Sequence, residues 1–508
     1  MDSTYATAFL AILVAGWFVY AKRAKKTSLP GPPRLPLIGS VHHMPTKSAW
    51  LVFSEWNKVY GGIFHLDVLG KPIVVINSVK IAKDLLDKRS SIYSDRPHAI
   101  MAGDLVGFSR TLAFLPYGDI WRKQRRLVVQ DFTPSMMPRY FALQEREVAA
   151  LVRNLLKAPD TVRDELQLRL GTIIIRVTYG YHVESLDDSM LKLGLGAIEN
   201  FSRTTMPGRY LVDIIPALHY LPEWIPGAGF LKEAEEMRQQ LIDAANKPYE
   251  WCKANLMTGK TLMPNLCGSI VQDAGDQLSN DLEETTIWSA VAMLGGGLDT
   301  NESAALSFIM AMVLHPEIQK KAHAELDSVI GSERLPLISD RPNLPYIRSI
   351  MAETLRWAPP VPLGVPHAVT EDDVYDGQFI PKGSVLLANV WHMLHDPEVY
   401  PSPMEFNPER FNGDDTAMDN AKELVFGFGR RICPGVHFAE GTLFCIITTL
   451  LATCDILPQL DAQGRDVLPE YAYTGGTIVV PEKFNFRLKA RSAHMVALVD
   501  EASLVPPE

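Results

Sequence analysis

The sequence has few cysteines and no excess of basic residues. Its 508 residues include five cysteines, none of them paired as Cys-x-x-Cys. So small and scattered a set excludes a disulfide scaffold and favours a reducing compartment. The 49 lysines and arginines are outnumbered by 59 aspartates and glutamates, which gives a net charge of −10. Because a nucleic-acid binder needs a basic surface to displace phosphate counterions, we expect no nucleic-acid partner.

The sequence also lacks internal repeats and low-complexity tracts, which excludes repeat architectures. Apolar residues make up 47% of the chain and charged residues 21%. This is the composition of a globular protein, so disorder as the main state is excluded. The length allows about three domains, or one large domain with a composite core.

One long apolar run stands at the N-terminus. Residues 5–21 (YATAFLAILVAGWFVYA) carry no charge, and the basic cluster KRAKK follows at residues 22–26. As a helix, the run reaches about 25 Å, near the lower limit for a membrane span. A cleaved signal peptide would have its positive charges before the apolar run and a small-residue cleavage site after it. The observed order predicts a single-pass membrane anchor over residues 1–26, with the rest of the chain in the cytosol.

A proline-rich segment follows the predicted anchor. Residues 29–40 (LPGPPRLPLIGS) contain four prolines. Proline fixes φ and removes a hydrogen-bond donor, so residues 27–40 are predicted to form a stiff hinge. No later stretch has the composition of a linker, and residues 41–508 are therefore predicted to form a single domain.

The periodicity of this domain predicts mainly α-helix with small β-sheets. Alternating β-branched residues around a turn predict a hairpin over residues 62–76. Helical periodicity dominates residues 78–340. Short strands are expected over residues 361–387, a helix from Pro434 to about Cys454, and further strands over residues 468–488 around Thr474-Gly475-Gly476.

Cys433 differs from the other four cysteines in its surroundings. It lies in FGFGRRICPG, residues 426–435, where three glycines and a proline indicate a constrained loop. Pro434 suits the first turn of a helix, whose dipole favours a thiolate. Arg430 and Arg431 add positive charge. The remaining cysteines are interpreted as small buried hydrophobic residues.

This loop resembles the haem-binding loop of the cytochrome P-450 monooxygenases, whose pattern is F-x-x-G-x-R-x-C-x-G. Four more motifs of that family occur in its order and at its spacing. They are W-x-x-x-R (Trp121 and Arg125), (A/G)-G-x-(D/E)-T (Gly296–Thr300), E-x-x-R (Glu353–Arg356) and P-E-R-F (Pro408–Phe411). The resemblance covers essentially the whole chain. The anchor and hinge are similar to those of the family's microsomal branch, and segments such as NPERF are similar to fungal secondary-metabolism members.

The resemblance implies a cytochrome P-450 fold that binds haem b. The thiolate of Cys433 is expected to be the axial iron ligand, and thiolate ligation favours O–O cleavage. Buried propionates need cationic or donor partners. The residues expected to hold the haem are Trp121, Arg125, His367, Phe426, Arg431 and Gly435.

Glu353 and Arg356 are three residues apart and share one face of a helix. Alone they would form a weak surface ion pair. The resemblance implies a buried three-way network with Arg410 that supports the cysteine loop.

Three successive glycines precede Asp299 and Thr300, and glycine in a helix interior costs about 1 kcal/mol relative to alanine. We therefore expect a local break in the helix. The resemblance makes Asp299 and Thr300 the catalytic pair that supplies protons to bound oxygen. The alternative is that Thr300 only caps the break by bonding back to a carbonyl. Asn301 departs from the family pattern, where a second threonine often follows.

The predicted function is a membrane-bound monooxygenase of the endoplasmic reticulum. It would use O₂ and electrons from NADPH, delivered by a cytochrome reductase, to hydroxylate a lipophilic molecule. A terpenoid is the first expectation, and a polyketide or an aromatic alkaloid also fits. The alternatives are a haem-thiolate isomerase or dehydratase acting on a hydroperoxide without NADPH, and a non-enzymatic haem sensor.

Two further surfaces follow from the resemblance. The substrate pocket is expected along residues 100–114, 201–230, 293–294, 361–365 and 473–477, which are mainly apolar. The basic run at residues 121–126 (WRKQRR) is either a solvated helix face or a docking site for an acidic reductase, since complementary charge steers encounter.

Overall fold

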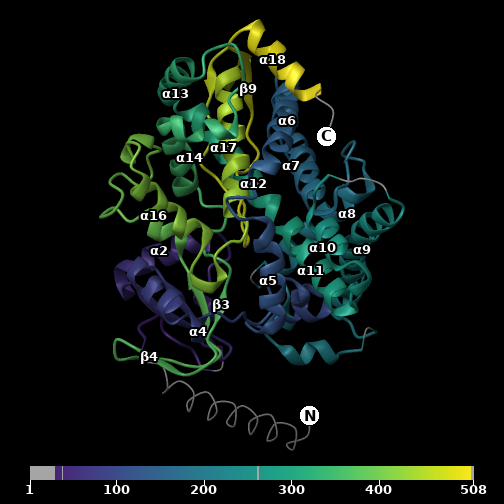
Figure 1. Ribbon diagram of the computed structural model, residues 1–508. Coiled ribbons are helices and arrows are strands. Elements are labelled where there is room, and N and C mark those ends of the chain that lie inside the picture. Colours follow the sequence, from purple (N-terminus) through teal and green to yellow (C-terminus); the bar gives the residue numbers. More distant parts are fainter. Residues whose placement is uncertain (1–28, 37, 207, 223, 260–262, 505–508) are drawn as a thin grey trace, which may run out of the picture.

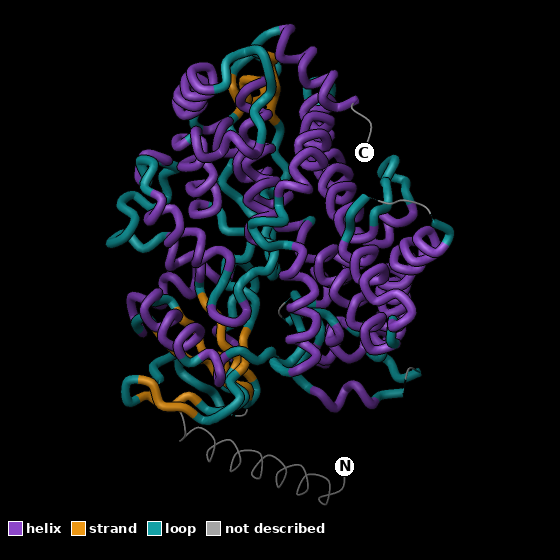
Figure 2. Tube along the Cα trace, viewed as in Figure 1, coloured by secondary structure: helices purple, strands orange, loops and turns teal. Residues whose placement is uncertain are grey.

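The computed structural model describes residues 29–504, except 37, 207, 223 and 260–262. The predicted anchor, residues 1–26, lies outside the described residues, as do the first two residues of the predicted hinge. Figures 1 and 2 show a mainly helical protein with strands gathered in two places, below α16 and beside α18. This confirms the prediction of helices with small sheets.

The longer helices carry most of the core. They are α2 (Ala49–Tyr60), α5 (Asp119–Asp131), α6 (Pro138–Leu155), α7 (Val162–Tyr179), α8 (Ser189–Thr204), α9 (Gly229–Met257), α11 (Asn280–Gly297), α12 (Asp299–Leu314), α13 (Pro316–Val329), α14 (Pro345–Trp357), α16 (Asp415–Phe426), α17 (Val436–Thr453) and α18 (Ala493–Leu504). Shorter ones are α3 (Val79–Ala82), α4 (Ser90–Tyr93), α10 (Leu266–Ala274) and α15 (Val390–Leu394).

Short 3-10 and π helices connect these helices. They are η1 (Val41–His43), η2 (Lys83–Lys88), η3 (Ile100–Leu105), η4 (Phe108–Arg110), η5 (Pro159–Thr161), η6 (Leu211–Asp213), η7 (Pro216–Tyr220), η8 (Gly275–Gln277), η9 (Ile338–Asn343), η10 (Pro408–Arg410) and η11 (Gly429–Arg431). Two of them, η4 and η11, each contribute a residue to the cavity described below.

A four-stranded sheet has the order β1-β2-β6-β3. Its strands are β1 (Ile63–Val68), β2 (Lys71–Ile76), β6 (Val385–Ala388) and β3 (His367–Ala368). β1 and β2 form the predicted antiparallel hairpin, and β6 joins β2 in parallel. β3 pairs His367 with Leu386, and this register holds the histidine at the edge of the sheet. β4 (Asp373–Tyr375) and β5 (Gln378–Ile380) form a separate hairpin.

The C-terminal strands are β7 (Cys454–Leu460), β8 (Asp466–Val467) and β9 (Phe486–Ala490). Of these strands, only β9 overlaps the predicted range of residues 468–488, at the end of that range. The expected strands around Thr474-Gly475-Gly476 are wrong, because residues 468–485 form no ladder beyond the bridge between Tyr473 and Pro481. This segment is instead attached to α12, where the Ser303 hydroxyl donates to the carbonyl of Val479 at 2.6 Å.

Helix α17 begins after Pro434, as predicted, and runs through the main core. Among the described residues it alone is long and apolar enough to cross a membrane. However, 83% of it is buried inside the protein, where it packs against α6, α12, α13 and α14. It is therefore a core helix. The loop before α17 and the region where α11 meets α12 line the same cavity, which is the candidate site described next.

Candidate functional site

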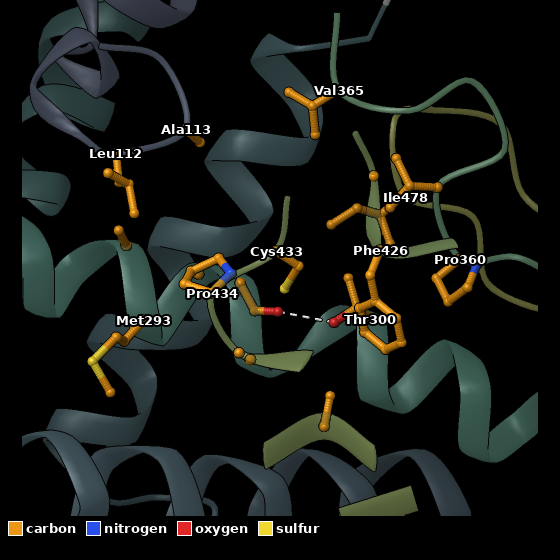
Figure 3. Close-up of a pocket in the computed structure, with 18 of the residues that line it drawn as sticks. Leu112, Ala113, Met293, Thr300, Pro360, Val365, Phe426, Cys433, Pro434 and Ile478 are labelled. Carbon is orange, nitrogen blue, oxygen red and sulfur yellow. Dashed lines mark hydrogen bonds between the residues drawn. The ribbon is translucent and has the colours of Figure 1, made fainter. Parts of the chain in front are cut away.

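A cavity of about 380 Å³ lies between the α11–α12 junction and the loop that precedes α17. Cys433 and Thr300 both line it, and Figure 3 shows the two side chains in the same pocket. Phe426, the last residue of α16, and Gly435, the N-cap of α17, also line this cavity.

The loop that carries Cys433 depends on a glycine at position 429. Gly429 has φ +54°, and a Cβ there would lie 2.2 Å from the carbonyl oxygen of Leu86. The Cys433 N–H donates to the carbonyl of Phe426 at 2.8 Å, which closes the loop. Burial raises the pKa of the Cys433 thiol, whereas the Gly435 N–H and the Arg125 guanidinium oppose that rise.

Arg431 is buried with all of its bonds going to backbone carbonyls. It is 9% exposed and donates to Ser94 at 2.8 Å, Leu112 at 3.3 Å and Leu115 at 2.7 Å. Its guanidinium also lies 4.6 Å from the ring centroid of Trp121, a cation–π contact. Burial lowers the pKa of Arg431 to about 10.

Arg125 and His367 line the cavity beside Arg431. Arg125 donates to the carbonyl of Ile432 at 2.5 Å, and His367 Nδ1 lies 2.7 Å from the carbonyl of Tyr93. A carbonyl only accepts, so Nδ1 of His367 carries the proton. Burial, aided by nearby arginine charge, lowers the pKa of His367 to about 3 and keeps the ring neutral.

Arg96 is a lining residue that sequence reasoning missed. Its Nε donates to the carbonyl of Ala113 at 2.9 Å, and Nη1 donates to Val365 at 2.9 Å and Pro366 at 2.7 Å. Burial lowers the pKa of Arg96 to about 9. No motif marks this arginine, because two of the three carbonyls that it binds, those of Val365 and Pro366, lie about 270 residues later in the sequence.

These cations fit a dianionic group. Among the described residues, the recorded side-chain hydrogen bonds of Arg96, Arg125 and Arg431 all go to carbonyls, and none of the three forms an ion pair. Arg431 is buried, and Arg96 and Arg125 are half-buried. Asp95 is the carboxylate whose charge acts on Arg96 and Arg431. One carboxylate leaves the three cations short of counter-charge, which is costly at sites shielded from water. A haem with two propionates would supply that charge, and the donor set beside Cys433 therefore suits it.

Glu353, Arg356 and Arg410 are brought together in a buried cluster. Both members of the Glu353–Arg356 pair are fully buried, with bonds of 2.7 and 2.9 Å. Arg410 Nε donates to Glu353 at 3.1 Å. Arg356 also donates to the carbonyl of Leu394, and both arginines donate to that of Glu405. The cluster thus ties α14 to the irregular segment that leads to α16.

The glycine-rich helix is broken as predicted, at Leu298 between α11 and α12. The Thr300 hydroxyl donates to the carbonyl of Gly296 at 2.8 Å, and the Asn301 amide donates to that of Gly297 at 2.8 Å. These bonds are the ones that the capping alternative expects. Thr300 and Asn301 nevertheless both line the cavity.

Asp299 lies beside this pair but is not among the lining residues. Burial and then the charge of Glu302 raise the pKa of Asp299 to about 7. The carboxyl is therefore able to gain or lose a proton near neutral pH.

The distal lining is apolar and overlaps the predicted segments in part. Phe108, Phe201, Val361, Val365 and Thr477 line the cavity within those segments. Helices α7, α8 and α9 add lining residues outside them, namely Ile174, Gly194, Ala197, Ile198 and Ala244.

The basic run at residues 121–126 divides between the two sides of α5. Arg125 lines the cavity, whereas Arg122, Lys123 and Arg126 are exposed. Arg122 pairs with Asp119, and Lys123 pairs with Asp281 at 2.7 Å.

A thiol on a constrained loop, an apolar cavity and three arginines that form no ion pair among the described residues fit the class of haem-thiolate proteins. The chain belongs to the cytochrome P-450 family, since the family model for cytochrome P-450 matches residues 29–485. It is similar to cytochrome P-450 monooxygenase 105 of Postia placenta, 47% identical over 500 residues that cover 98% of this chain and 96% of that relative. Monooxygenase 45 of the same fungus is 49% identical over 473 residues, which cover 93% of this chain and 89% of that relative. Monooxygenase claR of Ampulloclitocybe clavipes is 38% identical over 481 residues, which cover 94% of this chain and 89% of that relative.

The chain is therefore a cytochrome P-450 monooxygenase of the fungal type, an oxidoreductase of a family that binds haem through a thiolate.

Proposed function

We propose that this chain hydroxylates a neutral lipophilic molecule, that Cys433 would hold the iron of haem b, and that a cytochrome reductase delivers the electrons of NADPH. The observation that carries the proposal is that the Cys433 thiol and the Thr300 hydroxyl line one apolar cavity. When bound, the haem would supply the activation of O₂, and a thiolate ligand favours O–O cleavage.

The chain's own residues hold and orient the group. Arg96, Arg125 and Arg431 neutralise the propionates, and Trp121 stacks on Arg431 to keep that guanidinium in place. His367, bonded to Tyr93 through Nδ1, completes this side of the site. Phe426 and Gly435 flank the thiolate ligand.

Glu353, Arg356 and Arg410 have a supporting role. They hold the segment before α16, and through it the loop that carries Cys433.

Thr300 and Asp299 deliver protons in this proposal. The Thr300 hydroxyl donates to the carbonyl of Gly296, so its lone pairs would accept from a water in the cavity and hold it in place. Asp299, whose pKa lies near 7, would be the acid that supplies the proton.

The hydrogen bonds of the lining narrow the substrate class. In the distal cavity, Thr111, Thr300 and Asn301 already donate to backbone carbonyls at 2.7–2.8 Å, and Thr477 donates at 3.5 Å. Among these four side chains, the only donor left is the second N–H of the Asn301 amide. A substrate with a carboxylate or several carbonyls would lose more hydration than one donor replaces, whereas a hydrocarbon or an alcohol would not. A terpenoid hydrocarbon or alcohol of fungal secondary metabolism meets this requirement.

We propose the cytosolic face of the endoplasmic reticulum membrane as the location. Residues 1–26 would be the anchor, residues 27–40 the hinge and residues 41–508 the catalytic domain. The exposed Arg122 and Arg126 on α5 support docking of an acidic reductase near the haem.

The test uses holoenzyme with a cytochrome reductase, NADPH and a terpenoid alcohol panel. Thr300→Ala is expected to keep the haem spectrum while the ratio of hydrogen peroxide to hydroxylated product rises several-fold. Thr300→Ser, which keeps the hydroxyl, is the matched control and should couple like wild type. An unchanged ratio in Thr300→Ala, together with lower thermal stability, would establish the capping role instead. Product formation from a hydroperoxide without NADPH would favour an isomerase or dehydratase.

A further inference from the structure

Helix α12 carries a second buried carboxylate, which the proposed function leaves without a role. Glu302 is 4% exposed and lies one turn after Asp299. Residues three apart on a helix lie on the same face, so the two carboxyls are neighbours.

Glu302 is supplied with donors from α7. Its Oε2 accepts from Gln167 Nε2 at 3.3 Å, and its Oε1 lies 3.7 Å from Arg163 Nε. The Arg163 side chain is 44% exposed and also donates to the carbonyl of Pro481 at 2.8 Å. Burial raises the pKa of Glu302 and the charge of Asp164 adds to that rise, whereas the Gln167 amide and the Arg163 guanidinium oppose it. The contact between α7 and α12 thus includes the half-exposed Arg163, Gln167 and the buried carboxylate of Glu302.

Asp299 has no such support. Among the described residues it has no recorded hydrogen bond or ion pair, and Glu302 is the charged group that acts on it. When two buried carboxyls are neighbours, the one with donors ionises and the one without donors keeps the proton.

We propose that Glu302 is a positioning residue that keeps Asp299 in its protonated, proton-donating form near neutral pH. Gln167 and Arg163 stabilise the negative charge on Glu302, and that charge disfavours a second one on Asp299. This inference rests on the proposed role of Asp299 as the acid of the site.

The test is the pH profile of product formed per NADPH consumed. Burial is the larger cause of the raised pKa of Asp299 and the Glu302 charge adds to it, so Glu302→Gln lowers that pKa. The alkaline limb, which is the fall in coupling at high pH, then moves to lower pH. With a wild-type pKa near 7, coupling is expected to fall several-fold at pH 7.5 and by a smaller factor at pH 6. A merely structural loss would lower coupling equally at both pH values.

Two further variants keep the test decisive. Arg163→Gln removes the cation that balances the Glu302 charge, so the pKa of Asp299 should rise and the limb should move to higher pH, opposite to the shift in Glu302→Gln and measurable even if that variant does not fold. Glu147→Gln is the matched control, since Glu147 is also 4% exposed and paired with arginine but does not line the cavity. It should leave the limb in place.

Asp299→Asn separates this inference from the proposed function. Loss of the limb in Asp299→Asn, with a shift in Glu302→Gln, supports both. Loss of the limb in Asp299→Asn without a shift in Glu302→Gln or Arg163→Gln overturns the role of Glu302 alone. A limb that persists in Asp299→Asn shows that another group is the acid and overturns both.

Discussion

Replacing Glu353 by glutamine tests the role of the buried cluster of Glu353, Arg356 and Arg410. The Glu353 carboxylate accepts from Arg356 Nε at 2.7 Å and Nη2 at 2.9 Å, from Arg410 Nε at 3.1 Å and from the Asn407 N–H at 2.8 Å. Both Glu353 and Arg356 are 0% exposed. Glutamine keeps the shape of the side chain but removes its charge and one acceptor oxygen.

The expected loss of stability follows from the burial of Arg356. Removing one partner of a buried ion pair leaves an uncompensated charge, at a cost of about 3–5 kcal/mol. A typical unfolding free energy is about 5–15 kcal/mol, so the loss is a large fraction of the total. The same arginines hold the carbonyls of Leu394 and Glu405. Poor haem incorporation is therefore expected along with lower stability.

Urea unfolding, followed by tryptophan fluorescence and by the Soret band, measures this loss. Glu55→Gln is the control, because Glu55 and Lys58 have the same i,i+3 spacing at 2.7 Å but are 68% and 71% exposed. An exposed pair contributes at most about 1 kcal/mol. Equal midpoints for Glu353→Gln and Glu55→Gln would refute the reasoning that burial makes the cluster important.

Three further changes give distinct expected outcomes. Cys433→Ala should abolish the red-shifted Soret band of the reduced carbon monoxide complex, and retention of that band would identify another cysteine as the ligand. Gly429→Ala would place a Cβ 2.2 Å from the Leu86 carbonyl, so purified protein should hold less haem than Gly464→Ala, a control glycine with positive φ and no close neighbour. Deletion of residues 1–26 should weaken sedimentation with vesicles and leave the haem spectrum unchanged, and loss of haem would contradict the anchor.

The class of reaction was predictable from the sequence, because its chemistry is carried by short motifs. One motif is a cysteine in a glycine-rich loop before Pro434, and the other is an acid–alcohol pair after three glycines. Both are local patterns that can be recognised in the sequence without knowledge of the fold. Helix α17 and the β1–β2 hairpin were predictable for the same reason, since caps, turns and periodicity act over a few residues.

Only the tertiary structure decided which side chains meet at the cavity. Arg96 lies there because residues 365–366 supply carbonyls for its guanidinium, a contact that no local pattern contains. After the break at Leu298, Thr300 and Asn301 line the cavity, whereas Asp299 does not. The segment around Thr474 is attached to α12 by side-chain bonds instead of forming strands. Each outcome depends on packing between distant segments, and the free energy of such packing is not determined by the residues of any one segment.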